Sequence, residues 1–162
     1  SAESTARNLP GVKVRFPGAC KWTLAEVRNG VTIPYELVVD NEIEMIVPEP
    51  NDATGCKQPG ESGLIVGERI DGGGQNWCRC DTGLCPDRDY QPRTLEAGVY
   101  SGKIEWEGHN WQGPSDYGAP KGELFPAGTY EVTVAAKGRR LEHDGDSAQA
   151  SVKGVLEIEL TP

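Results

Sequence analysis

The sequence predicts an all-β protein folded as an antiparallel β-sandwich of about eight strands, and three observations favour this fold class. Apolar and polar residues alternate in several separate segments, the pattern of strands with one buried face. Glycine and proline are plentiful, at 21 and 12 residues, as in a chain with many turns. No segment shows sustained helical periodicity. Short strands of this kind hide their apolar faces by stacking as two sheets or by closing as a barrel, and we choose the sandwich.

The first half of the chain begins with a polar segment, residues 1–10, which we predict to be a flexible N-terminal arm preceding a single domain over residues 11–162. Residues 22–28 fit a short helix and a strand equally well. Residues 48–60 are rich in turn-forming residues and predict a loop. The predicted strands of this half span residues 12–16, 33–39, 43–47, 64–70 and 77–80, the last two forming a hairpin around the glycines at 72–74.

The second half shows the cleanest alternation, which predicts strands over residues 100–106, 130–136 and 148–160. In the last of these, seven successive even-numbered positions from Ala148 to Leu160 carry small or apolar residues. That run outweighs a helical interpretation of the segment.

Composition and charge exclude several classes of function. The net charge of −9 argues against a nucleic-acid partner, which requires clustered lysine and arginine. No apolar segment approaches the roughly 20 residues that span a bilayer. Because no nucleophile elbow and no other catalytic or cofactor motif is found, we expect a protein that is not an enzyme and needs no cofactor.

Five cysteines, an odd number, support two alternatives. The first is two disulfides in an oxidising compartment, with Cys20 or Cys56 joined to the cluster of Cys78, Cys80 and Cys85, and a second small loop closed onto Cys85. A Cys78–Cys80 bridge is the least expected, because residues i and i+2 of a strand lie about 7 Å apart. The second is a thiolate metal site.

The metal alternative uses Cys78, Cys80 and Cys85, with Cys56 or His109 as the fourth ligand. Structural zinc sites usually combine two paired half-sites, and this chain has one C-x-C-x₄-C without a match. We therefore favour disulfides, and with them an exported protein of the bacterial periplasm or cell surface. Attachment as a lipoprotein through a missing N-terminal segment is left open.

One stretch resembles a known family. Residues 106–113 (Trp-Glu-Gly-His-Asn-Trp-Gln-Gly), followed by 124–134 (Leu-Phe-Pro-Ala-Gly-Thr-Tyr-Glu-Val-Thr-Val), are similar to the immunoglobulin-like module of flagellar hook-capping proteins and to BsuPI-type bacterial proteinase inhibitors. The resemblance implies an immunoglobulin-like sandwich in which Tyr130 anchors a strand corner from inside. The chain departs from this pattern by a loop inserted at residues 114–123 and by its Cys-rich hairpin.

The inserted loop supplies the candidate ligand site, consisting of Trp111 and Tyr117 with Asn110 and Asp116 close by. Aromatic rings beside hydrogen-bonding side chains are typical of sugar or peptide recognition. The alternative is structural, with Trp111 folded over the sheet edge and Tyr117 packed under the loop.

We therefore expect a non-catalytic binding or assembly module that contacts a protein partner through its loops. Three alternatives stay open: a carbohydrate-binding module using Trp111 and Tyr117, with a cell-surface glycan as partner; a proteinase inhibitor presenting the hairpin over residues 71–85; and a metal-binding protein using the clustered thiolates.

Overall fold

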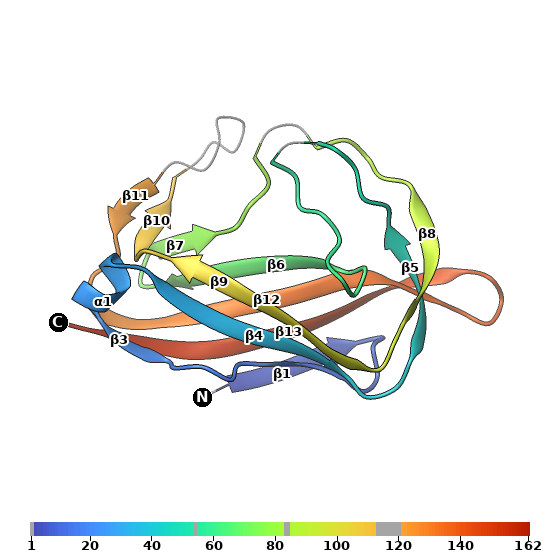
Figure 1. The fold of residues 1–162 in the computed structure, drawn as a ribbon, viewed down its shortest axis with the longest axis horizontal. Coiled ribbons are helices and arrows are strands. Elements are labelled where there is room, and N and C mark those ends of the chain that lie inside the picture. Colours follow the sequence, from blue (N-terminus) through green and yellow to red (C-terminus); the bar gives the residue numbers. More distant parts are fainter. Residues whose placement is uncertain (1, 54, 83–84, 113–120) are drawn as a thin grey trace.

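Two layers of strands, all antiparallel except for the parallel pairing of β3 with β13, form the protein, and the all-β sandwich that the sequence predicts is confirmed (Figure 1). The computed structural model describes residues 2–53, 55–82, 85–112 and 121–162. The larger sheet contains β1 (Ala2–Arg7), β3 (Lys21–Thr23), β5 (Ile43–Pro48), β6 (Ile65–Gly72), β7 (Gln75–Cys78), β8 (Tyr90–Leu95), β12 (Gly128–Leu141) and β13 (Ser147–Thr161). The smaller sheet contains β2 (Val12–Arg15), β4 (Val31–Val39) and β9 (Gly98–Trp106), and a separate ribbon contains β10 (His109–Trp111) and β11 (Lys121–Leu124).

The hairpin of β12 and β13 forms the centre of the larger sheet. The two strands pair without a break from Gly128↔Leu160 to Leu141↔Ser147. From Ala150 to Leu160 every even-numbered residue of β13 is buried, which confirms the strand predicted there. On its other side β12 pairs with β6 up to Lys137 and with β5 from Arg139 onward, so its neighbour changes at Gly138.

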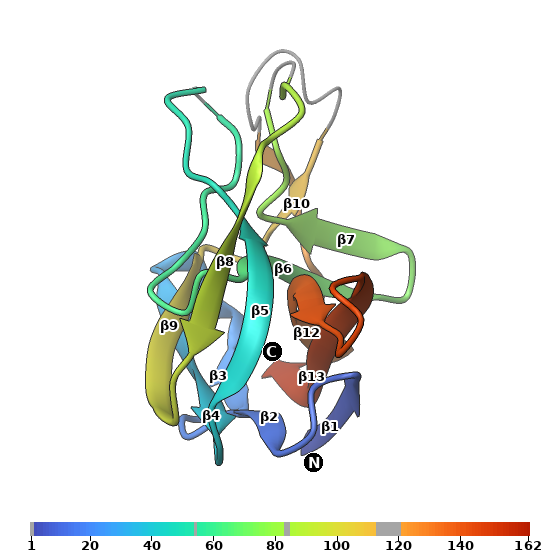
Figure 2. The same cartoon turned by 90° about the vertical axis from the view of Figure 1, so that its right-hand side faces the viewer.

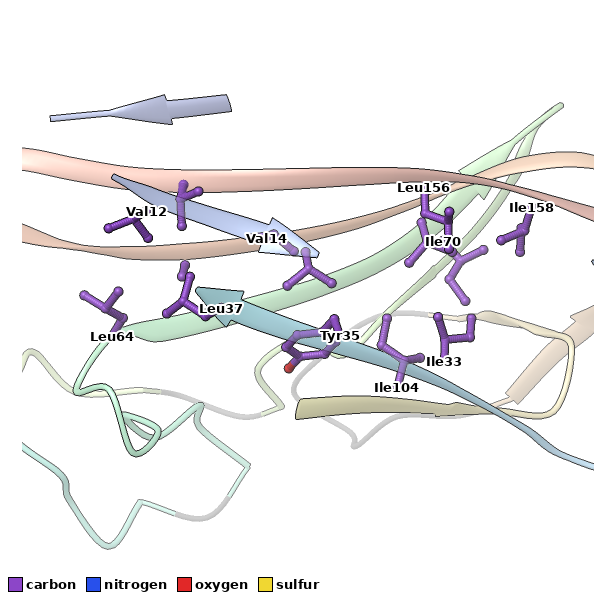
Figure 3. Close-up of a cluster of buried hydrophobic side chains, with 14 of the residues drawn as sticks. Val12, Val14, Ile33, Tyr35, Leu37, Leu64, Ile70, Ile104, Leu156 and Ile158 are labelled. Carbon is purple, nitrogen blue, oxygen red and sulfur yellow. The ribbon is translucent and has the colours of Figure 1, made fainter. Parts of the chain in front are cut away.

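The hydrophobic core lies between the two layers (Figure 3). Side chains of β2 and β4 point toward those of β6 and β13, and Ile104 adds to them from β9. Alternation along each strand therefore places one apolar row of each strand in this core, as the period-two pattern requires. The labelled members are Val12, Val14, Ile33, Tyr35, Leu37, Leu64, Ile70, Ile104, Leu156 and Ile158.

An aromatic corner closes one end of the sandwich. Phe125 lies with its ring centroid 4.8 Å from that of Trp106 and 4.8 Å from that of Tyr130. The Tyr130 hydroxyl donates to the carbonyl of Pro126 at 2.6 Å. Tyr130 therefore anchors the corner from inside, as expected.

Residues 22–28 combine the two structures that the sequence left open. Trp22 lies in β3, and Leu24–Arg28 form the short helix α1. Thr23 caps this helix, because its side chain accepts from the Glu26 amide while the Glu26 carboxylate accepts from the Thr23 amide.

The prediction of a flexible N-terminal arm over residues 1–10 is wrong for the part of it that the structure describes, residues 2–10. Ala2–Arg7 form β1, which pairs with β13 from Ala2↔Leu156 to Arg7↔Ser151, and Leu9 is buried. All six side chains of β1 are exposed, so the strand has no apolar alternation for sequence reasoning to detect. Main-chain hydrogen bonds to the free edge of β13 hold it instead. The short strands β8, β10 and β11 were not predicted either.

Candidate functional site

Two long connections leave the sandwich side by side at one end (Figure 2). Residues 49–64 connect β5 to β6, and residues 79–89 connect β7 to β8. The described parts of these two segments are called the loop pair below. At its base the Glu49 amide donates to the Asp89 carbonyl at 2.8 Å, which continues the pairing of β5 with β8 by one more step.

A disulfide and several hydrogen bonds join the two halves of the loop pair. Cys56 and Cys85 form the disulfide, with their Cα atoms 5.8 Å apart. The Thr82 amide donates to the Gly55 carbonyl at 2.8 Å, and the Lys57 amide donates to Asp81 Oδ1 at 2.7 Å. Arg88 donates to Gln58 Oε1 at 3.1 Å and to the Lys57 carbonyl. The two segments therefore form one cross-linked unit.

The first segment also satisfies its own polar groups. Gln58 Oε1 accepts from the Asn51 amide at 2.9 Å, and Gln58 Nε2 donates to Asn51 Oδ1 at 3.0 Å. Asn51 Oδ1 accepts in addition from the Ala53 amide at 3.1 Å. These bonds hold the segment without a sheet ladder, so its conformation is set before any partner binds.

A buried polar group holds the loop pair where it leaves the two sheets, a place that we call its root. Glu68 of β6 is 4 % exposed and accepts from the Tyr35 hydroxyl at Oε2, at 2.5 Å. Its other carboxylate oxygen lies 3.5 Å from Arg79 Nη1, and its main-chain carbonyl accepts from the Arg79 amide at 3.0 Å. Arg79 is the first residue of the second segment, so Glu68 connects both layers to the loop pair.

The surroundings of this group perturb two pKa values. Burial raises the pKa of Glu68, while the hydrogen bond from Tyr35 and the charges of Arg79 and Lys57 lower it by less. Burial, and then the hydrogen bond to Glu68 and its charge, raise the pKa of Tyr35. A hollow of about 190 Å³ opens beside the group, lined among others by Tyr35, Gln58, Arg79 and Tyr100.

The buried pair of Tyr35 and Glu68 was not identified from the sequence, although the sequence contains a signal for it. Glu68 occupies an inward position in the alternating row of Leu64, Val66 and Ile70. An acidic residue in an apolar row requires a buried partner, and the Tyr35 hydroxyl of β4 is that partner.

The cysteine pairing differs in part from the expectation. Cys56 joins the cluster, as preferred, but the second bridge is Cys78–Cys80, and Cys20 is free and exposed. The expectation against Cys78–Cys80 is wrong because β7 ends at Cys78 instead of continuing to Cys80, and the two Cα atoms lie 5.2 Å apart. That separation is one a disulfide spans.

The alternative metal site loses its ligands through this pairing. The sulfurs of Cys78, Cys80 and Cys85 are all in disulfides, so none is a thiolate. His109 lies in β10, and burial lowers its pKa. Across residues 2–53, 55–82, 85–112 and 121–162, no cluster of three ligating side chains suited to a metal ion occurs.

The structure describes two of the four residues of the predicted ligand site, Asn110 and Trp111, whereas Asp116 and Tyr117 lie outside the described residues. Asn110 joins β10 to its neighbours: its Oδ1 accepts from the Asn76 amide at 2.7 Å, and its Nδ2 donates to Gln75 Oε1 at 2.7 Å and to the Glu123 carbonyl at 3.0 Å. Trp111 is half-buried and packs against the core. These contacts favour a structural role for both residues.

No helix in the described part of the chain is long and apolar enough to cross a membrane. No protein-family model matches the sequence, and no curated protein or solved structure matches it either.

Proposed function

We propose that the protein is a non-catalytic binding module that presents the loop pair to a protein partner. The observation that carries this proposal is the covalent and hydrogen-bonded linkage of two segments that, apart from Leu64, lie outside the sandwich core. A loop that is ordered before binding loses less conformational entropy on association, which increases affinity.

The surface of the loop pair suits a protein better than a small molecule. Its exposed charged side chains are mostly acidic, and the hollow at its root is small for a ligand pocket. A mainly acidic surface held in a fixed conformation can match a protein surface of opposite charge. Its exposed charged residues include Asp52, Glu61, Arg79, Asp81, Asp87 and Asp89.

The two disulfides are compatible with an exported protein, because such bridges persist in oxidising compartments. Within this proposal the module belongs to the bacterial periplasm or cell surface, with a lipoprotein tether as one form of attachment. The immunoglobulin-like resemblance of residues 106–134 stays a prediction.

Site-directed photo-crosslinking tests the proposal. A photoreactive phenylalanine derivative is placed at Asp52 or Asp87 on the loop pair, and at Asp144 on the distant hairpin as a matched exposed control. Each variant is incubated with the cell-envelope fraction of the producing organism. We expect one discrete adduct from Asp52 and Asp87 and none from Asp144. An adduct from Asp144 alone, or equal labelling at all three positions, would refute the loop pair as the binding surface.

Proteinase inhibition is a second candidate, favoured by the bridge from Cys85 to Cys56, since a braced segment resists cleavage. The test is inhibition of a panel of serine proteinases by the oxidised protein. Stoichiometric inhibition that is lost in the Cys56→Ser/Cys85→Ser variant would support it, and cleavage of the loop pair by every enzyme of the panel would eliminate it.

A further inference from the structure

A hollow lies on the outer face of the larger sheet, at the point where β12 changes its neighbour. Lys137 is the last residue of β12 that pairs with β6, opposite Ile65, and from Arg139 onward β12 pairs with β5. Because β5 ends at Pro48 and β6 begins at Ile65, the two successive neighbours of β12 meet beside Lys137. The hollow at this place measures about 490 Å³, a volume typical of ligand pockets.

Three cations form one wall of this hollow. Arg7 of β1 and Lys137 of β12 both pair with Ser151 of β13, so their Cα atoms lie about 10 Å apart, two strand spacings, in one cross-strand row. Arg139 follows two residues further along β12, about 7 Å away. No described acidic residue lines the hollow, and none of the three cations forms an ion pair with a described residue. In a chain of net charge −9, this local excess of positive charge favours an anionic ligand.

Hydrogen bonds hold this wall in position before a ligand binds. Arg139 Nε donates to Ser147 Oγ at 2.7 Å, and Arg139 Nη2 donates to the Ser147 carbonyl at 2.9 Å. Asn8 Nδ2 donates to the Gln149 carbonyl at 2.7 Å and so fastens the end of β1, next to Arg7, to β13. A cation that is fixed in advance loses less conformational freedom when it binds an anion, which increases affinity.

The other wall is apolar and contains an exposed aromatic ring. Pro48 pairs with Tyr90 of β8, and Ile65 joins them in this wall. Tyr90 is 55 % exposed, the highest fraction among the large hydrophobic side chains that the structure describes. An exposed ring beside apolar neighbours offers a flat contact for the C–H face of a ligand ring. Gln149 and Ser151 add hydrogen-bonding side chains to the lining.

We propose that this hollow binds a carboxylated sugar, as a free uronic acid or as the end of a polyuronate chain. The cations bind the carboxylate, and an arginine does so through two N–H groups of its planar fork. The apolar wall packs against the C–H face of the sugar ring, while Gln149 and Ser151 bond to its hydroxyl groups. An inorganic anion would use the cations alone, and an aromatic acid would leave the polar side chains of the lining without a partner.

The extent of the basic surface favours a compact ligand. Along β12 and β13 the face becomes acidic at Glu131 and Glu157, which pair with each other about 20 Å from Lys137. In the other direction, the connection between these strands carries the exposed Glu142 and Asp144. A nucleic acid or an anionic membrane surface would extend past the hollow and meet these carboxylates, which repel it. The lining residues lie outside the loop pair, so the sugar site goes beyond the proposed function and does not rest on it.

A chemical-shift titration of the isotope-labelled, oxidised protein tests the site, with galacturonate and trigalacturonate as probes. We expect saturable shifts at the amides of Lys137 and Ser151. The methyl ester of galacturonate, which keeps the ring and loses the charge, should bind at least about tenfold more weakly. Equal affinity for the two acids assigns the site to a free uronic acid, and tighter binding of the trisaccharide assigns it to a polyuronate chain.

Variants of the two walls separate the roles of charge and ring. Lys137→Gln and Tyr90→Ala should each raise the dissociation constant for galacturonate by about tenfold. Lys153→Gln is the matched control, since Lys153 is exposed on β13 but does not line the hollow, and it should leave the affinity unchanged. The dispersion of the amide spectrum shows whether each variant is folded.

Four results would overturn the sugar site. The first is the absence of saturable binding at millimolar galacturonate and trigalacturonate. The second is sulfate binding as tightly as galacturonate, which would leave an unselective anion site. The third is tighter binding of polyglutamate than of trigalacturonate, which would assign the hollow to an acidic protein segment. The fourth is an unchanged affinity in folded Tyr90→Ala, because the ring would then have no part in binding.

Discussion

Tyr35 and Glu68 are the residues on which the position of the loop pair depends. The Tyr35 hydroxyl is the short hydrogen-bond donor to a carboxylate that is almost fully buried. Removing it with Tyr35→Phe leaves the Glu68 carboxylate less satisfied, and we expect a loss of about 1–3 kcal/mol in the free energy of unfolding at neutral pH. Urea unfolding measures this loss. Tyr90→Phe is the matched control, because Tyr90 is 55 % exposed, and a loss of equal size there would refute the assignment.

Glu68 also predicts a pH dependence of stability. Its pKa in the folded protein is raised by burial, so the folded state binds more protons than the unfolded state between the ordinary pKa and the raised one. The stabilisation from protonated Glu68 is therefore complete below the ordinary pKa and is lost as the pH rises through the raised pKa. Glu68→Gln removes this dependence.

The difference in unfolding free energy between Glu68→Gln and the wild type should therefore change in favour of the variant as the pH rises from about 4 to 8. Because the other carboxyl groups titrate alike in both proteins, their contributions cancel. Urea unfolding at several pH values measures the difference. A constant difference across this range would mean that Glu68 titrates normally.

At the scale of elements, the bridge between Cys56 and Cys85 holds the two loop segments together. Closing a loop across 29 residues contributes roughly 3–4 kcal/mol on the chain-entropy estimate. We expect Cys56→Ser/Cys85→Ser to lose up to that amount and to be cut by trypsin first at Lys57 or Arg88. Cys20→Ser is the control and should change neither property, since Cys20 is free. Equal proteolysis of the double variant and the wild type would show that the hydrogen bonds alone fix the loop pair.

The elements that could be predicted from the sequence are those with one buried and one exposed face. β4, β12 and β13 alternate clearly, and the structure has them where the pattern predicts them. β1 was missed because all its side chains are exposed, so it has no buried row, and its main-chain pairing with β13 defines it. The Cys78–Cys80 bridge was missed because a strand was assumed to continue through Cys80. The root of the loop pair depends on Tyr35 and Glu68, which lie 33 positions apart and which local patterns cannot bring together.

At the scale of the whole molecule, the two layers approach each other closely at Gly154. A Cβ atom added there would lie 2.5 Å from Val14 Cβ, across the interior between β13 and β2. Gly154→Ala must therefore push the layers apart, and we expect a loss of about 1–3 kcal/mol in thermal or urea unfolding. Gly60→Ala is the control, because the nearest atom to its added Cβ is 4.0 Å away. A neutral Gly154→Ala would contradict the packing of β2 on β13.

The molecule combines two parts with different roles: a hydrophobic core between two sheets, and a cross-linked loop pair at one end. The loop pair is central, since the proposed function depends on it. Peptide mapping of the unreduced protein tests it most directly, with free thiols alkylated before digestion. We predict a Cys56 peptide linked to a Cys85 peptide, Cys78 and Cys80 joined to each other, and alkylated Cys20. A bridge from Cys20 to any other cysteine, or an alkylated Cys56, would contradict the braced loop pair.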